Sequence, residues 1–108
     1  MPKRYDVHWV TLDPGRGSEL RKTRPAVIVS LDVLNRALET VVVCPLTTQL
    51  HPAWRSRISV KIAGKAAEIA VDQIRAISKS RLGRKIGALS ARDAATLRRL
   101  LVEMYADN

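Results

Sequence analysis

The sequence predicts a mainly β domain that ends in one α-helix. Short β-rich runs separated by turn residues fill the first four-fifths of the chain, and the last segment changes to a helical period. Many short strands followed by one helix favour a small, strongly bent sheet or barrel closed by that helix. The length of 108 residues indicates one domain, residues 1–108. No Gly-rich phosphate loop follows a strand, so a nucleotide-binding α/β fold is unsupported.

The expected strands differ in how strongly their residues indicate them. Residues 57–62 alternate apolar and polar side chains, which is the period of a strand buried on one face. Residues 25–30 and 40–44 are rich in β-branched side chains, as is typical of buried strands. The full set of expected strands is residues 6–12, 25–30, 40–44, 57–62, 68–77 and 82–89.

Two helices are expected. Residues 31–38, between two buried strands, fit a short helix. The longer helix begins after Ser90, which can cap it, with Asp93 three residues later. We expect this helix to be amphipathic and to pack on the sheet. Its apolar stripe contains Ala94, Leu97, Leu101 and Met104.

The charge of the chain indicates an anionic partner. Lys and Arg number 19 against 10 Asp and Glu, a net charge of +9. Nucleic acid, an anionic membrane and an acidic protein all fit this excess. The membrane is disfavoured, because the sequence contains no apolar span, no signal peptide and no basic amphipathic helix with aromatic anchors. We therefore expect a cytoplasmic protein, and charge alone does not separate RNA, DNA and acidic protein.

Cysteine and histidine do not indicate a metal site. Cys44 is the one cysteine and lies in an apolar run, so we expect a small buried hydrophobic residue. His8 and His51 are far apart in the sequence, and no Cys/His cluster has metal-ligand spacing. Trp54 beside Arg55 can stack on an unpaired base, cap the core or bind a partner helix, and all three roles stay open.

A polar loop precedes the strand at residues 25–30 and carries candidate chemistry. Arg24 stands just before that strand, where a rigid guanidinium can clamp a phosphate with two hydrogen bonds and stabilise developing charge. Glu19 is a potential base or hydrogen-bond acceptor. The alternative is a solvated, charged loop in which Arg24 forms a surface ion pair.

Two further polar groups follow or interrupt apolar runs. Thr47, Thr48 and Gln49 offer hydroxyls and an amide at a strand end, where they can bind phosphate oxygens or base edges, although an ordinary polar turn explains them more simply. Asp72 and Gln73 interrupt an apolar run and need partners. Substrate, a dimer mate and a structural network are all candidates.

Taken together, these segments resemble the MazF/PemK family of toxins almost from end to end. The resemblance rests on the order and separation of the blocks, since each block alone is only moderate evidence. The blocks are residues 6–14, 17–19, 23–30, 45–49, 71–77, 81–83 and the final helix.

The resemblance implies an SH3-like barrel of the CcdB/PemK type, closed by the C-terminal helix and working as a homodimer. It implies a metal-independent, sequence-selective endoribonuclease that cleaves single-stranded RNA and needs no cofactor. The 2′-OH would attack the adjacent phosphate and leave 2′,3′-cyclic phosphate and 5′-OH ends. The implied protein partner is an antitoxin with an acidic, flexible segment, which suits the +9 charge.

Carried over residue by residue, the resemblance gives Arg24 the role of the catalytic arginine. Thr47 is similar to the threonine that hydrogen-bonds the scissile phosphate, and Thr48 takes its place if the register differs by one residue. Glu19 would assist proton removal from the 2′-OH. The residues similar to RNA-binding positions are Ser18, Thr48, Gln49, Asp72 and Gln73.

The chain departs from the family pattern at three positions. Tyr5 replaces the usual glycine before the first strand. Ser18 and Ala70 stand where some members have His and Arg, which in those members belong to an acid–base set around the aspartate. Their absence weakens Asp72 as a catalytic acid or base and moves weight to Arg24 and Thr47.

Two rival functions fit the same fold. One is a toxin that inhibits DNA gyrase by binding it, because related barrels do so and fold does not determine function. The other is a non-catalytic RNA-binding module that uses the same basic surface.

Overall fold

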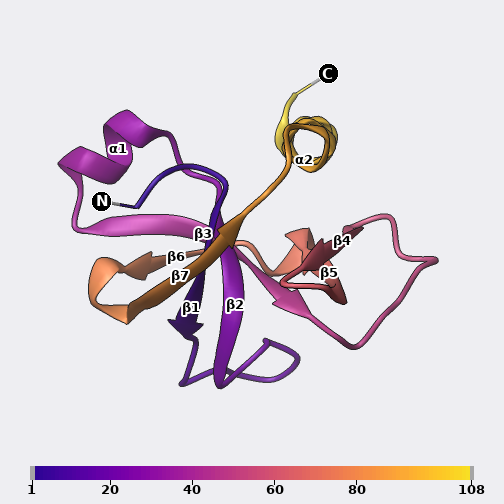
Figure 1. Cartoon of the computed structure of the whole chain (residues 1–108), viewed down its shortest axis with the longest axis horizontal. Helices are drawn as coiled ribbons and strands as arrows, with labels where there is room; N and C mark the ends of the chain where they lie inside the picture. Colours follow the sequence, from indigo (N-terminus) through magenta and orange to yellow (C-terminus); the bar gives the residue numbers. More distant parts are fainter. Residues whose placement is uncertain (1, 108) are drawn as a thin grey trace.

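The computed structural model describes residues 2–107, so Met1 and Asn108, the ends of the expected domain, lie outside the described residues. A curled antiparallel sheet is followed by a C-terminal helix (Figure 1), which confirms the mainly β expectation. The strands and α-helices are β1 (Asp6–Thr11), β2 (Thr23–Ile28), α1 (Asp32–Ala37), β3 (Thr40–Thr47), β4 (Arg57–Ile62), β5 (Lys65–Ala70), β6 (Arg75–Ser78), β7 (Leu82–Ala88) and α2 (Ala91–Tyr105). The short 3-10 helices are η1 (Val71–Gln73) and η2 (Lys79–Arg81).

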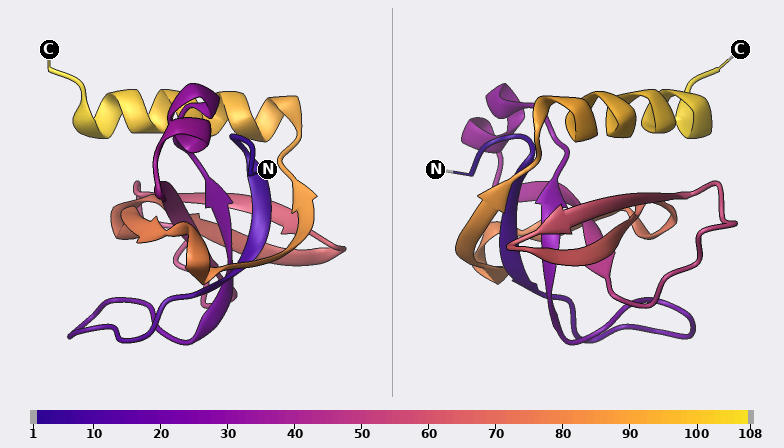
Figure 2. Two further views of the ribbon diagram at one scale, coloured as in Figure 1. Left: turned by 90° about the vertical axis from the view of Figure 1, so that its left-hand side faces the viewer. Right: turned by 45° about the vertical axis from the view of Figure 1, so that its right-hand side comes forward.

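Strand β3 is shared by the two parts of the sheet. The strand order is β4-β5-β3-β2-β1-β7, and β6 also pairs with β3. The first half of β3 pairs with β6, and its last residues pair with β5. This change of partner curls the sheet into a half-barrel. Figure 2 shows α2 across one end of the sheet, with the loop between β1 and β2 extending from the opposite end.

Alternate residues of the central strands enter two core clusters. In β2, Val27 belongs to the cluster that Leu97 of α2 joins, while Ala26 and Ile28 belong to the cluster that Ile77 of β6 joins. This is the two-residue period of a strand with both faces covered. It explains why residues 25–29 form an uninterrupted apolar run in the sequence.

Both expected helices are confirmed within small shifts of their ends. The α2 helix begins after Ser90, whose hydroxyl accepts the Asp93 N–H at 3.1 Å. This is the expected N-cap, which satisfies one free N–H of the first turn. No helix among residues 2–107 is both long and apolar enough to cross a membrane.

The single strand expected over residues 68–77 is wrong. Strand β5 ends at Ala70, the chain turns through η1, and β6 begins at Arg75. The Ile74 N–H donates to the Val71 carbonyl at 3.2 Å and closes this turn, which carries Asp72 out of the ladder. The two polar residues in the apolar run therefore mark a turn between strands.

Other strand limits also differ from expectation: β2 spans Thr23–Ile28 rather than residues 25–30, and β1 and β7 each end one residue early. Strand β5 begins at Lys65, directly after β4, because Ala63 (φ 52°) and Gly64 (φ 80°) make a two-residue hairpin turn. Strand β3 continues past Cys44 to Thr47. Pro45 falls where one edge of β3 changes partner from β6 to β5, so a residue without an N–H is tolerated there.

Candidate active site

Arg24 and Thr47 lie on neighbouring strands and line one cavity of about 460 Å³. Strand β2 includes Arg24, so this residue is inside the strand rather than before it. The β2–β3 register pairs Ala26 with Pro45, and continuing it by two residues places Arg24 opposite Thr47. Thr48 lines the same cavity. Its apolar walls include Trp9, Pro25, Leu46, Ile62, Ala67 and Ile86.

The guanidinium of Arg24 is held by backbone rather than by an acid. Its Nε donates to the Arg21 carbonyl at 2.8 Å. Among residues 2–107 Arg24 forms no ion pair, so the surface ion pair considered from the sequence is absent from the described part of the chain. The bond through Nε leaves the two terminal nitrogens without a protein partner among residues 2–107, and a guanidinium can make two parallel N–H···O bonds to a phosphate.

The loop end that carries this carbonyl is fixed by long-range hydrogen bonds. Lys22 adopts a left-handed conformation (φ 68°), its N–H donates to Asp13 Oδ1 at 2.8 Å, and its carbonyl accepts the Leu12 N–H at 2.9 Å. Arg81 donates to the Asp13 carbonyl at 3.1 Å, and Arg75 donates to the Leu12 carbonyl at 3.2 Å. Asp13, Lys22, Arg75 and Arg81 had no individual role in the sequence-based prediction, although they lie in the candidate loop or in the family blocks.

The Thr47 hydroxyl is buried and oriented. The residue is 4% exposed, and its Oγ accepts the Gln49 N–H at 3.1 Å. A hydroxyl that accepts through a lone pair keeps its own proton to donate. Thr48 is exposed and makes no such bond among the described residues. The fixed hydroxyl in the cavity is therefore that of Thr47.

Other predicted site residues gather in a second cavity. Glu19, Asp72 and Gln73 line a space of about 260 Å³, beside Pro45 of β3. The Glu19 carboxylate accepts the Arg16 N–H at 2.7 Å, which closes a turn in the loop between β1 and β2. Ser18 and Gln49 are exposed and line neither cavity. The structure thus divides the predicted set into two groups around β3.

Asp72 belongs to a network of charged side chains. It accepts hydrogen bonds from Ser56 Oγ at 3.0 Å and Arg57 Nε at 2.9 Å. Arg57 also lies 3.7 Å from the buried Glu68 carboxylate, which accepts the His51 N–H at 2.9 Å. Burial alone would raise the pKa of Asp72, but the bonds from Arg57 and Ser56 outweigh it and lower that pKa. Of the roles open for Asp72, the structural network is present.

Comparison with known proteins identifies the family. Residues 3–105 match the family model described as PemK-like, MazF-like toxin of type II toxin–antitoxin system. The chain belongs to this toxin family. It is 32% identical over 106 residues to endoribonuclease MazF9 of Mycobacterium tuberculosis, covering 90% of each chain. It is 36% identical over 89 residues to endoribonuclease EndoA of Bacillus subtilis, covering 78% of this chain and 77% of EndoA.

Solved structures confirm the expected fold. One similar structure is an endoribonuclease from Mycobacterial species in complex with its cognate antitoxin. Its TM-score is 0.80 at 22% identity, and the match covers 95% of this chain and 93% of that one. A crystal structure of MazF from Deinococcus radiodurans has a TM-score of 0.83 at 21% identity, over 95% of this chain and 94% of that one. The half-barrel closed by a helix is therefore the fold of MazF toxins.

Trp54 is a surface residue of this toxin. It is 48% exposed and stacks on His51, with ring centroids 3.9 Å apart and planes 9° apart. The guanidinium carbon of Arg57 lies 4.7 Å from its ring centroid. Of the roles left open, the core role is wrong, and RNA and a protein partner stay open.

Cys44 is not available as a nucleophile. It is fully buried, as expected from its apolar run. Burial, with a smaller effect of the Asp72 charge, raises the pKa of its thiol to about 12. The thiol therefore stays protonated at neutral pH, and a protonated thiol is a poor nucleophile and metal ligand. The residues that the structure describes contain no group of three or more His, Cys, Asp or Glu side chains arranged to hold a metal ion.

Proposed function

We propose that this toxin is a sequence-selective endoribonuclease that cleaves single-stranded RNA without a metal ion. The observation that supports this most is the pairing of Arg24 and Thr47 in one cavity, with the Thr47 hydroxyl oriented and the terminal nitrogens of Arg24 free of protein partners among residues 2–107. The similar proteins MazF9 and EndoA are named endoribonucleases.

The reaction we propose uses a nucleophile that RNA itself supplies. The ribose 2′-oxygen forms a bond to the adjacent phosphorus, and the bond from phosphorus to the 5′-oxygen breaks. The 2′-OH loses its proton and the 5′-oxygen gains one, which leaves 2′,3′-cyclic phosphate and 5′-OH ends. The protein then needs only to orient the strand and to stabilise charge on the phosphate.

Arg24 and Thr47 fit these two tasks. The terminal N–H groups of Arg24 would bind the non-bridging oxygens, whose negative charge grows as the fifth bond to phosphorus forms. The Thr47 hydroxyl would donate to the same phosphate and fix its position. Glu19 lines the other cavity, so assistance in proton removal requires the loop between β1 and β2 to bring it towards Arg24.

The second cavity would bind neighbouring bases. Asp72 and Gln73 offer an acceptor and an amide there, and such groups read base edges in single strands. Ser18 and Gln49 are exposed and would contact the RNA outside the two cavities. Thr48, in the wall of the first cavity, would add a hydroxyl contact.

The proposed protein partners are a second copy of this chain and a cognate antitoxin. A similar solved toxin is bound to its cognate antitoxin. An acidic, flexible antitoxin segment suits a chain of net charge +9, because opposite charges steer association.

Cleavage of mixed single-stranded RNA in the presence of EDTA tests the function. Wild-type protein should give fragments with 5′-OH and 2′,3′-cyclic phosphate ends, and Arg24→Ala should give none. No cleavage by the wild type overturns the proposal, and cleavage abolished by EDTA overturns its metal-free mechanism. RNA binding without a cyclic-phosphate product would indicate the non-catalytic module, and inhibition in a gyrase supercoiling assay would indicate the gyrase-binding rival.

A further inference from the structure

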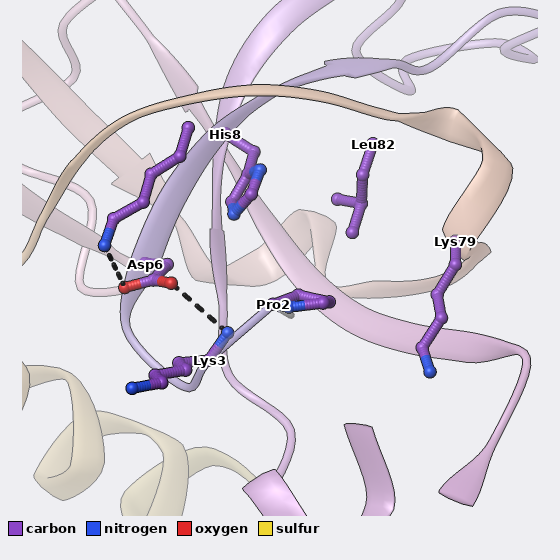
Figure 3. Close-up of a pocket in the computed structure, with 7 residues that line it drawn as sticks. Pro2, Lys3, Asp6, His8, Lys79 and Leu82 are labelled. Carbon is purple, nitrogen blue, oxygen red and sulfur yellow. Dashed lines mark hydrogen bonds and ion pairs between the residues drawn. The ribbon is translucent and has the colours of Figure 1, made fainter. Parts of the chain in front are cut away.

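A third cavity, of about 400 Å³, lies at the start of β1, away from Arg24 and Thr47. Its wall includes Lys3, Asp6 and His8, with Lys79 on the other side of the space (Figure 3). Its volume is within the range of small-molecule sites. Nothing in the proposed cleavage mechanism uses these residues.

One ring nitrogen of His8 is buried without a partner. Its Nδ1 lies 3.0 Å from the Gly83 carbonyl. A carbonyl only accepts, so Nδ1 carries the proton in this bond, and in the neutral ring Nε2 is a free acceptor. Nε2 has no hydrogen-bond partner among the described residues, although it is closed off from solvent. A buried polar atom without a partner costs free energy, and this cost favours a small movement of the covering side chains that lets a ligand in the cavity donate to Nε2.

The cations of this cavity are only partly neutralised. Asp6 is 7% exposed, and its two oxygens are taken by Lys85 Nζ at 3.2 Å and by the Lys3 backbone N–H at 3.2 Å. Within residues 2–107, the ammonium groups of Lys3 and Lys79 form no ion pair. Asp6 thus orders one lysine and leaves two ammonium groups for an anion.

We propose that this cavity is a second nucleotide-binding site. A nucleotide brings phosphate oxygens for Lys3 and Lys79, and it brings a ribose hydroxyl or base amino group that can donate to His8 Nε2. An acidic peptide satisfies the lysines through its carboxylates and can donate to His8 only through its backbone N–H groups. A nucleotide carries phosphate oxygens and hydroxyl or amino donors on one compact unit, so it suits a small cavity that combines cations with a free acceptor better than a peptide does.

The nucleotide can be free or can belong to an RNA chain. The basic edge of the sheet favours the RNA chain. Strand β7 ends the strand order, so its outer edge has no strand partner among the described residues. Lys79 and Arg81 of η2 and Arg84 and Lys85 of β7 lie within seven residues of the chain. Ile86 of β7 lines the Arg24 cavity, and Lys85 lines this one. An RNA chain that crosses β7 would reach both the Arg24 cavity and this cavity.

Imidazole NMR with adenosine 5′-monophosphate tests the site without any cleavage. The chain has only two histidines, so His51 is an internal control. We expect saturable shifts of the His8 nitrogens and none at His51. Absence of a His8 shift, equal affinity for inorganic phosphate, or displacement of the nucleotide by a polyglutamate peptide would each overturn the proposal.

Calorimetry on variants tests the residues. His8→Asn keeps a donor near Gly83 and removes the acceptor at Nε2, and should weaken nucleotide binding about fivefold. Lys79→Gln should weaken it about threefold, while Lys61→Gln, the same charge change on the exposed side of β4, should not. Unchanged binding by Lys79→Gln would contradict the proposal even if His8→Asn fails to fold.

An oligoribonucleotide titrated onto Arg24→Ala protein distinguishes the two sources. If the oligoribonucleotide shifts the His8 signals, the site binds a nucleotide within an RNA strand. If only the mononucleotide shifts them, the site binds a free nucleotide. Because the mononucleotide titration needs no catalysis, failure of RNA cleavage and failure of this second site are seen separately.

Discussion

Arg24 Nε donates to the Arg21 carbonyl at 2.8 Å, so the guanidinium is oriented by the backbone three residues before it. A neighbouring carboxylate would have neutralised its charge and competed with phosphate. A backbone carbonyl orients the group and leaves its full charge for the substrate. The contact also makes the site depend on the conformation of the loop between β1 and β2.

Replacement of Arg24 by lysine should remove most of the activity. Lysine keeps the charge but lacks the planar pair of donors, so we expect kcat to fall by about 10²-fold or more. Single-turnover cleavage of RNA measures this rate. Arg92→Lys, an exposed change on α2, is the matched control and should cleave like the wild type. A near-normal rate for Arg24→Lys would mean that bidentate phosphate binding is not needed.

Asp13 should act as a positioning residue for Arg24. Asp13→Ala removes the acceptor of the Lys22 N–H, and we expect a loss of about tenfold in kcat with little change in KM, because a misplaced catalytic group costs rate. Asp13→Asn removes the same charge but keeps an acceptor oxygen, so it should restore most of the rate. If both variants lose equal activity, the charge of Asp13 is what matters and the positioning role is wrong.

The hydroxyl of Thr47 should be needed, and that of Thr48 should not. Thr47→Val keeps the shape of the side chain but removes its donor, so kcat should fall about tenfold or more. It also leaves the Gln49 N–H without its acceptor, at a cost of about 1 kcal/mol in the free energy of unfolding. Thr47→Ser should keep both properties. A rate loss in Thr48→Val rather than Thr47→Val would shift the phosphate contact by one residue.

The stability contributed by Asp72 should depend on pH. Its folded pKa is lowered below the ordinary value of 3.8, so its ionised form stabilises the protein above that pH. This contribution is lost as the pH falls through the lower, folded pKa. Asp72→Asn should therefore lower Tm at pH 7, and the difference from the wild type should shrink below about pH 4. A difference that stays constant with pH would show that the charge of Asp72 does not contribute.

The sequence predicted those parts of the fold whose signals are local. Residues 57–62 were placed correctly because their alternation needs only one buried face, and Ser90 was found because its cap lies three residues away. The return strand β5 was started too late because Ala63 is an unusual residue for a left-handed turn position. Strand β3 was ended too early because Pro45 normally breaks a ladder.

The residues of the candidate site likewise differ in whether their roles depend on local sequence or on contacts between distant segments. Arg24 and Thr47 are recognisable by residue type and by their family blocks. Asp13 also lies in a family block, but its role and that of Lys22 depend on hydrogen bonds between separate segments, among them the bond from Arg81, which is 68 residues away from Asp13 in the chain. The separation of Glu19 from Arg24 likewise depends on how β3 divides the two cavities.

The shared position of β3 has a consequence for the lifetime of the site. Val43 and Cys44 of this strand enter different core clusters, so β3 can open only when both clusters come apart. Amide hydrogens beside Thr47 should therefore exchange with solvent only through global unfolding, while those around Arg21 should exchange through small local openings. We therefore expect the Thr47 side of the candidate site to persist until the whole domain unfolds. The Arg24 side is held by a few surface hydrogen bonds of the loop between β1 and β2. A partner that binds this loop can therefore change the position of Arg24 without unfolding the barrel.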